Sequence, residues 1–278
     1  MVNAGGVSFH VQMMGDGPAL LLLHGAGAST HSFRDLAPLL AQRFRVIAPD
    51  LPGHGFSSSN GARTQSLTGM AKALAALLRA LDVAPALAVG HSAGAALLTR
   101  LALDKAIDPR LIVALNGAFA PFEGVAGHVF PPLAKALFLN PFTPRYFAWS
   151  ANRSAVERLI AGTGSKIDAR GVDLYARLVR NAAHVEGALG MMAHWDLHAL
   201  NRELPQLPTP LALIVADNDK TVPPQGARRL AARLVTARLY EISGLGHLSH
   251  EEAPELHARM IFELYEKAQP DMRATATA

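Results

Sequence analysis

The chain has 278 residues, of which 50% are hydrophobic and 17% are charged. This length suits one large domain, or one core domain with an insert, and the composition excludes a disordered chain. The absence of cysteine excludes disulfides, thiolate nucleophiles and cysteine-bound zinc. The same absence of cysteine leads us to expect a reducing compartment, the cytoplasm. Met1 to Gly6 lacks a basic and apolar leader, so we expect no signal peptide.

The formal net charge is +4, from 26 cationic and 22 anionic side chains. These charges are spread along the chain, and neither a basic stripe nor a nucleic-acid-binding module is visible. No apolar run approaches the roughly 20 residues of a transmembrane helix. We therefore expect neither a nucleic-acid partner nor a transmembrane segment.

Short apolar runs alternate with longer helical stretches, which predicts an α/β fold with a mostly parallel sheet flanked by helices. The expected strands are Val7–Met14, Ala19–Leu23, Arg45–Ala48, Ala86–Val89, Leu111–Leu115, Leu211–Ala216 and Arg238–Ile242. The expected helices are Phe33–Gln42, Leu67–Leu81, Ala93–Leu103, Pro224–Leu234 and Pro254–Lys267.

The alternation stops after Asn116, and the stretch up to Leu204 shows amphipathic helical segments with no convincing strand. We expect residues 1–118 and 205–270 to form one core, interrupted by a helical cap over residues 119–204. The cap should cover the carboxyl ends of the strands, where open α/β sheets bind ligands. Residues 271–278 should form a frayed tail.

The strongest chemical signal is the sequence Gly90-His91-Ser92-Ala93-Gly94, which lies between an expected strand and an expected helix. A sharp strand-to-helix turn of this kind exposes a nucleophilic serine, and small neighbours let the strand and the helix pass closely. The helix N-terminus favours a developing negative charge. Ser92 is therefore the candidate nucleophile, and a glycine-rich turn with a capping serine is the alternative.

A serine nucleophile needs a base and an acid that orients it, here in the order serine, acid, histidine. Asp219 follows the strand that ends at Ala216 and is favoured over Asp217, which suits a turn cap. His247 lies in a glycine-rich loop after the last strand and is favoured over His250 as the base.

An oxyanion hole needs two backbone N–H groups that converge on one point. Ala93, directly after the nucleophile, should supply one of them. The loop after His24-Gly25 should supply the other, from Ala26. We expect His24 itself to hydrogen-bond the loop rather than to take part in catalysis.

These motifs together resemble the α/β-hydrolase superfamily. They are His24-Gly25, Asp50-Leu51-Pro52-Gly53-His54-Gly55-Phe56-Ser57, Gly90 to Gly94, Asp219-x-x-Val222-Pro223 and Gly246-His247. They occur in the family's order and span the core. The resemblance implies an α/β-hydrolase fold with a helical cap insertion, and a structural role for the loop from Asp50 to Ser57.

A narrower set of residues resembles the magnesium-chelatase accessory proteins of bacteriochlorophyll synthesis. The set comprises Gly90–Ala96, Leu115–Phe122, Gly162–Ser165 and His184–Leu197. That family consists of hydrolase-like proteins associated with magnesium insertion into protoporphyrin. The resemblance implies a tetrapyrrole or magnesium chelatase as a partner, and relative to the family the chain is expected to start within the first hairpin.

Apolar side chains of the insert should pack as cap core, line an apolar substrate pocket, or do both. The pocket candidates are Phe119, Phe122, Trp149, Met191, Met192 and Trp195. His194 and His198 have the spacing of one helical face, but no third ligand is fixed, so we predict no metal site. The stretch Gly162 to Lys166 lacks the spacing of a phosphate loop.

Three functions follow as hypotheses, none of which requires a cofactor. The first is a serine hydrolase that acts on a small apolar ester-like or acyl substrate. The second is a non-catalytic tetrapyrrole-binding or chelatase-assisting protein. The third is a C–C bond hydrolase or cofactor-free peroxidase, which would use the same residues. A dehalogenase is disfavoured because residue 92 is serine rather than a carboxylate.

Overall fold

A computed structural model describes residues 1–120, 140, 142–150 and 152–268. Its centre is a seven-stranded sheet in the order β3-β5-β4-β6-β7-β8-β9. The strand β3 is antiparallel to β5, and the other neighbours are parallel, which confirms the predicted fold class. The strands are β3 (Val11–Met14), β4 (Ala19–Leu23), β5 (Arg45–Pro49), β6 (Leu87–His91), β7 (Leu111–Leu115), β8 (Leu211–Ala216) and β9 (Ala237–Ile242).

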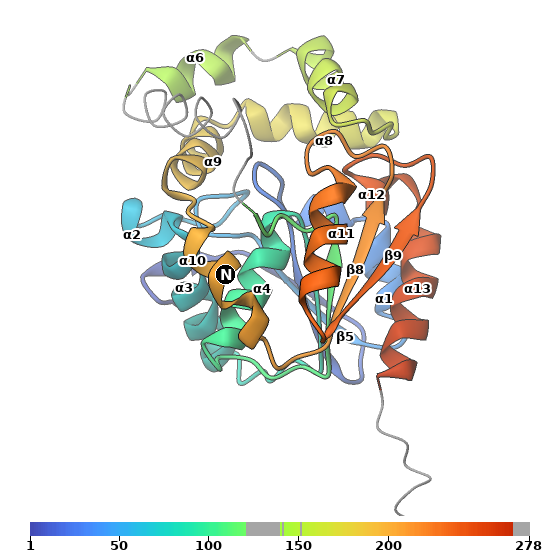
Figure 1. The fold of residues 1–278 in the computed structure, drawn as a ribbon. Helices are drawn as coiled ribbons and strands as arrows, with labels where there is room; N and C mark the ends of the chain where they lie inside the picture. The colour runs from blue at the N-terminus through green and yellow to red at the C-terminus, as the bar shows by residue number, and fades with distance from the viewer. Residues whose placement is uncertain (121–139, 141, 151, 269–278) are drawn as a thin grey trace, which may run out of the picture.

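Both faces of the sheet are buried, which explains why its inner strands are continuous apolar runs. In β4, Leu21 and Leu23 join the core on one face, and Leu20 and Leu22 join the core on the other. One face is covered by α3 (Leu67–Ala80), α4 (Ala93–Leu103) and α11 (Pro224–Arg233). The other face is covered by α1 (Leu36–Leu40) and α13 (Pro254–Lys267) (Figure 1).

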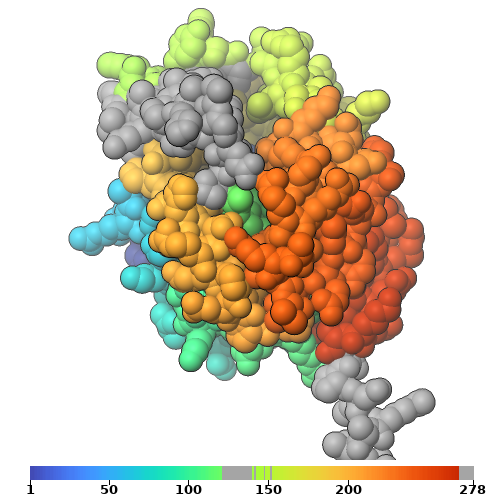
Figure 2. Space-filling model, in the orientation of Figure 1, coloured from blue at the N-terminus to red at the C-terminus, as the bar shows by residue number. Residues whose placement is uncertain are grey.

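Between β7 and β8 the described residues form only helices. Figure 1 shows α6 (Thr143–Ser150), α7 (Arg153–Gly162), α8 (Ala169–Val179) and α9 (Ala182–His194) above the edge of the sheet where β8 and β9 end. In Figure 2, α6 and α7 form separate ridges on top of the molecule. Because parallel strands end at one edge, this arrangement puts the helices over the loops that follow the strands.

The sequence predicts that the cap ends at residue 204, whereas the segment from residue 198 onward already packs against the core. The helix α10 (His198–Glu203) and the 3-10 turn η2 (Leu204–Gln206) contact α4. Leu200 and Leu204 are fully buried in the sheet-side core, because they complete the apolar cover of that face. This segment therefore packs as part of the core, although it precedes β8.

Two predicted elements are shorter than expected. Instead of one strand over Val7–Met14, the chain forms β2 (Val7–Phe9) and β3, separated at His10. The strand β2 pairs with β1 (Val2–Ala4), whereas His10 bonds the segment from Asp50 to Ser57 instead of continuing the ladder. The expected helix Phe33–Gln42 is a 3-10 turn, η1 (Thr30–Phe33), followed by α1.

The remaining helices of the described residues are α2 (Ala62–Gln65) and α12 (Ser249–Glu252). No helix among the described residues is long and apolar enough to cross a membrane. The predicted tail, residues 271–278, lies outside the described residues.

Candidate active site

Ser92 lies at the turn between β6 and α4, in a strained backbone conformation. Its φ is +50° and its ψ is −115°, which is costly for a residue with a side chain. The two flanking glycines allow the turn. A Cβ at Gly90 would lie 2.6 Å from Ala95 N, and one at Gly94 would lie 2.2 Å from Leu23 O. The strand-turn-helix context predicted for Ser92 is therefore present.

Asp219 and His247 meet at the carboxyl ends of β8 and β9. The distance from His247 Nδ1 to Asp219 Oδ2 is 2.7 Å, and both side chains are almost fully buried. The other carboxylate oxygen of Asp219 accepts the N–H groups of Thr221 and Val222, each at 2.8 Å. The carboxylate is thereby held in one orientation, with one oxygen reserved for the imidazole.

The rival acid and base lie in other surroundings. Asp217 is exposed and accepts the N–H of Gly244 at 2.8 Å, which is the turn-capping role expected for it. His250 is fully buried, with Nε2 at 2.9 Å from Ser32 Oγ. Burial holds the pKa of His250 well below its usual range. Asp217 makes no hydrogen bond to His247, and His250 makes no hydrogen bond to Asp219.

Asn116 holds the base loop, which is the loop Gly244–Leu248 that carries His247. The sequence analysis did not single out Asn116 as a functional residue. Asn116 Nδ2 donates to Gly246 O at 3.0 Å and to His247 O at 2.9 Å, and Asn116 Oδ1 accepts Ala216 N–H at 2.8 Å. Its φ of +46° turns the side chain back across the ends of β7 and β8. In the sequence, the asparagine-glycine pair directly after a buried strand could have indicated this role of Asn116.

His91 supports the same loop. Its Nε2 lies 2.9 Å from His247 O, and the two rings are 4.6 Å apart between centroids. Because a carbonyl only accepts, Nε2 carries the proton of His91. Burial lowers the pKa of His91 well below its usual range, which keeps the ring neutral beside the candidate base.

The loop after β4 approaches the serine directly. A Cβ at Gly25 would lie 2.8 Å from His91 Nδ1 and 3.1 Å from Ser92 Cβ. Ala26 follows in an exposed turn closed by the hydrogen bond from Ala28 N to Gly25 O. Ala93 is the first residue of α4, so its N–H has no acceptor within the helix. Ala93 and Gly25, the residue before Ala26, thus both lie next to Ser92.

His24 is a structural residue of this loop, as expected. Its Nε2 accepts Leu51 N–H at 2.9 Å, so its Nδ1 is the protonated nitrogen and donates to Gly25 O at 2.8 Å. Burial lowers the pKa of His24 to about 3, so the ring is neutral.

The loop from Asp50 to Ser57 is held by a buried carboxylate. Asp50 accepts the N–H groups of Thr30 at 2.7 Å and Phe56 at 3.0 Å, and it contacts His10 Nδ1 at 2.9 Å. These bonds join three segments of the core, in agreement with the structural role expected for this loop.

His184 of α9, which the sequence analysis noted only as part of a resemblance, contacts two loops of the core. Its Nδ1 accepts Gly55 N–H at 3.0 Å, and its Nε2 donates to Gly27 O at 3.2 Å. Burial lowers its pKa, so the neutral form that these bonds require is favoured. Through His184 a cap helix is attached to the loop that carries Ala26.

The predicted pocket residues separate into two groups. Phe119 and Met191 are buried in the core, and Trp195 packs partly against it. Trp149 is 82% exposed and Met192 is 44% exposed. These two are therefore not packed into an inner face of the cap. Trp149 lies on α6, at the top of the molecule in Figure 1. Phe122 lies outside the described residues.

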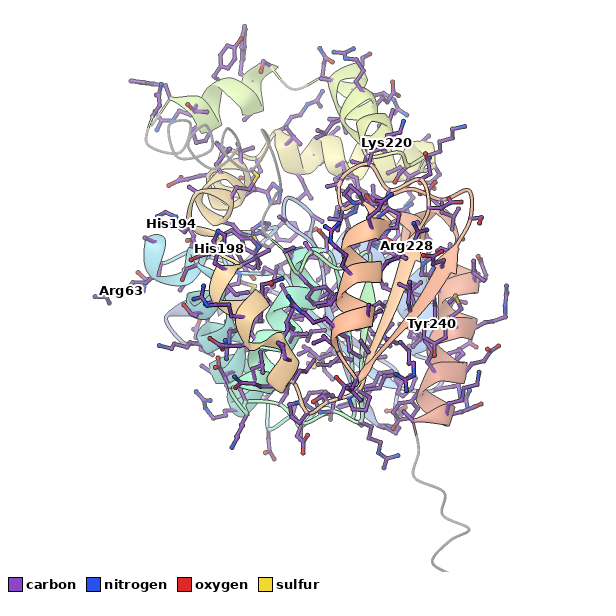
Figure 3. The ribbon with its side chains drawn as sticks, viewed as in Figure 1. Arg63, His194, His198, Lys220, Arg228 and Tyr240 are labelled. Atoms are coloured by element: carbon purple, nitrogen blue, oxygen red, sulfur yellow. The ribbon has the colours of Figure 1, made fainter. Side chains whose placement is uncertain are left out.

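His194 and His198 do not share a helical face. The helix α9 ends at His194, Trp195 is extended, and α10 begins at His198, whose N–H is capped by Asp196. Figure 3 shows the two histidines at this junction. Within the described part of the chain, no group of three or more histidine or acidic side chains could hold a metal ion.

Comparisons with known proteins show the family to which the chain belongs. The family model described as alpha/beta hydrolase fold matches residues 18–254. The chain belongs to the α/β-hydrolase family. A relative in Rhodobacter capsulatus, the magnesium-chelatase 30 kDa subunit, is 46% identical over 252 residues, which cover 90% of this chain and 88% of the relative. Both resemblances predicted from the sequence are thereby confirmed.

Two further proteins are similar at lower identity. The uncharacterized hydrolase YugF of Bacillus subtilis is 28% identical over 85% of this chain and 86% of its own length. A solved structure of a thermophilic esterase from Thermogutta terrifontis superposes with a TM-score of 0.74, at 22% identity over 95% of each chain. This second similarity concerns the fold alone.

Proposed function

We propose that this chain is a serine hydrolase in which Ser92, His247 and Asp219 act on an apolar ester-like or acyl substrate. The observation that carries the proposal is the buried 2.7 Å contact between His247 Nδ1 and Asp219 Oδ2. Ser92 supports it, because its strained turn directly follows His91, whose ring contacts the backbone of His247. A strained backbone at a sharp turn from a strand into a helix is typical of a nucleophile.

The chemistry follows from the proton positions. With Nδ1–H donated to Asp219, Nε2 of His247 is the basic nitrogen. It takes the proton of Ser92 Oγ while Oγ attacks the carbonyl carbon, and the N–H groups of Ala26 and Ala93 stabilise the oxyanion. His247 then protonates the leaving oxygen, the C–O bond breaks, and water repeats the sequence on the acyl-serine.

The proposed triad lacks one contact in the free protein, the hydrogen bond between Ser92 and His247. Among the described residues, no hydrogen bond joins Ser92 Oγ to His247. Catalytic hydrogen bonds are often long in the free enzyme and shorten when substrate binds. The proposal requires that Nε2 reaches Oγ in that complex.

The apolar substrate class is supported by the residues beside the serine. Ala118 N donates to Ser92 O at 3.1 Å, and the next residue, Phe119, is a buried apolar side chain. An uncharged acyl group suits these neighbours better than a charged one.

A series of p-nitrophenyl esters tests this function. We expect kcat/KM to rise from acetate to butyrate and hexanoate, and to be low for a succinate half-ester of similar length. Ser92→Ala should reduce each rate by at least about 10³-fold, since it removes the nucleophile. Hydrolysis that persists in Ser92→Ala would overturn the assignment.

The Rhodobacter relative favours a second function, an association with magnesium insertion into protoporphyrin. A porphyrin titration followed by absorbance, and co-purification with magnesium-chelatase subunits, test this function. Binding without any ester hydrolysis would favour a non-catalytic accessory role. Hydrolysis without porphyrin or chelatase binding would favour an ordinary hydrolase.

A further inference from the structure

The loop between α7 and α8 enters the core between the candidate acid and the candidate base. The carbonyl oxygen of Thr163 accepts two backbone N–H groups, from Lys220 at 3.1 Å and from His247 at 3.3 Å. Lys220 directly follows Asp219, so one cap atom is bonded to both loops of the pair. Figure 3 shows Lys220 on the side of the core that faces α7 and α8.

The fit around this carbonyl is tight on both sides. Gly164 has a φ of +85°, and a Cβ there would lie 2.0 Å from Asn218 O, in the acid loop. A Cβ at Gly246, in the base loop, would lie 2.3 Å from Gly164 C. Only glycine at these two positions lets the cap loop lie against both core loops at once.

Side chains fix the cap loop to the residues that flank His247. The hydroxyl of Ser165, which is buried, accepts Leu248 N–H at 2.8 Å. The carboxylate of Glu252 accepts Gly246 N–H at 2.8 Å and Lys166 N–H at 3.0 Å, and thereby bridges the base loop and the cap loop.

Apolar packing adds to this attachment. The side chain of Leu248 forms a small buried cluster with residues of α7 and α8. The members of the cluster are Val156, Ile160, Val172, Ala176 and Leu248. The residue directly after the candidate base is therefore part of the cap's own core.

We propose that the loop Thr163–Lys166 is a positioning element that sets the geometry of the Asp219–His247 pair. The inference rests on the proposed function, but concerns a different part of the chain. If the cap loop shifts, the two core loops lose their shared acceptor, and the Nδ1–Oδ2 contact loosens. The position of the cap loop and the orientation of His247 as a base are then coupled.

The test compares two glycine-to-alanine variants in the same loop region. Gly164→Ala places a Cβ against Asn218 O, whereas a Cβ at the exposed Gly162 meets nothing within 4 Å, so Gly162→Ala is the matched control. The readouts are kcat and KM for p-nitrophenyl butyrate, and the far-downfield proton resonance of the imidazole Nδ1–H, identified by its loss in Asp219→Asn.

We expect Gly164→Ala to lose at least about tenfold in kcat with KM within about twofold, because a small misplacement of a reacting group is costly. Its downfield resonance should weaken or disappear, while Gly162→Ala keeps both properties. Circular dichroism confirms that each variant is folded. If Gly164→Ala does not fold, Ser165→Ala, which leaves Leu248 N–H without its acceptor, should show the same loss to a smaller degree.

A folded Gly164→Ala that retains the kcat and the resonance of Gly162→Ala would overturn the positioning role, and so would an unaffected Ser165→Ala if Gly164→Ala cannot be folded. If the wild type hydrolyses no ester, the proposed function fails. The resonance still decides the positioning role in that case.

Discussion

Asp217 and Asp219 are two residues apart, and their surroundings give them different roles. Asp219 is buried and divides its oxygens between His247 and two backbone N–H groups. Asp217 is exposed and caps a turn through Gly244. The sequence motif Asp-x-x-Val-Pro favoured Asp219 as the acid, and the turn that it forms supplies the N–H groups of Thr221 and Val222 to the carboxylate.

Asp219→Asn should therefore reduce ester hydrolysis by about 10⁴-fold, since an amide favours the wrong imidazole tautomer. Asp217→Asn should leave the rate close to that of the wild type, because the amide oxygen still accepts Gly244 N–H. Steady-state kinetics on p-nitrophenyl butyrate distinguishes the two. A larger loss in Asp217→Asn would reverse the assignment of the acid.

The two candidate bases allow a similar comparison. His247→Ala should cost at least about 10³-fold in hydrolysis, because the serine hydroxyl loses its base. His250→Ala removes a buried ring that contacts Phe33 and His91, so its main effect should be a lower thermal midpoint. A His250→Ala variant with the greater loss of rate per folded molecule would exchange the two roles.

At the scale of elements, the cap helices reach both halves of the site. The loop after α7 bonds the acid and base loops, and α9 bonds the oxyanion loop through His184. A sequence pattern shows that a helical insert exists, but it does not show which of its residues return to the core. The contacts of His184 and Thr163 with the core were not predicted for this reason, since their partners lie more than fifty residues away along the chain.

His184→Ala should lower kcat for p-nitrophenyl butyrate by about tenfold with a smaller change in KM, because Gly27 O loses its donor and the loop of Ala26 is less well held. The matched control is Glu186→Ala, an exposed position on the same helix. If both variants behave alike, His184 holds the cap in place without affecting the oxyanion loop.

The elements of the core were largely predictable from the sequence. Apolar runs such as Leu111–Leu115 and Leu211–Ala216 match strands residue for residue, because strands buried on both faces allow few polar residues. The break at His10 was not predictable. It depends on hydrogen bonds from His10 to Asp50 and Ser57, which lie forty or more residues away along the chain. The exposure of Trp149 likewise depends on where α6 lies in the cap.

At the scale of the whole molecule, buried imidazoles determine how stability depends on pH. Burial lowers the pKa of His24 to about 3 and that of His31 to about 4. Five further histidines have a pKa lowered by burial, namely His54, His91, His184, His250 and His257. Glu251 has the opposite sign, since burial raises its pKa to about 7.

Below pH 6.5 the unfolded chain binds protons that these folded histidines exclude, so the free energy of unfolding should fall as the pH falls from 7.5 to 5.5. Each imidazole contributes up to about 1.4 kcal/mol per pH unit below its unfolded pKa. Between the unfolded and folded pKa values of Glu251, this carboxyl makes the folded state more stable as the pH falls, which offsets the contribution of one histidine. Urea denaturation across this range measures the slope, and a flat or rising stability toward pH 5.5 would contradict the burial of neutral imidazoles.

The central claim is that Ser92 is a nucleophile activated by the pair His247 and Asp219. The most direct measurement is covalent labelling with a fluorophosphonate probe, followed by mass spectrometry of the labelled peptide. We expect one probe per chain, attached to Ser92, with slow labelling in His247→Ala and none in Ser92→Ala. A folded wild-type protein that takes up no probe, or takes it up at another residue, would contradict the account.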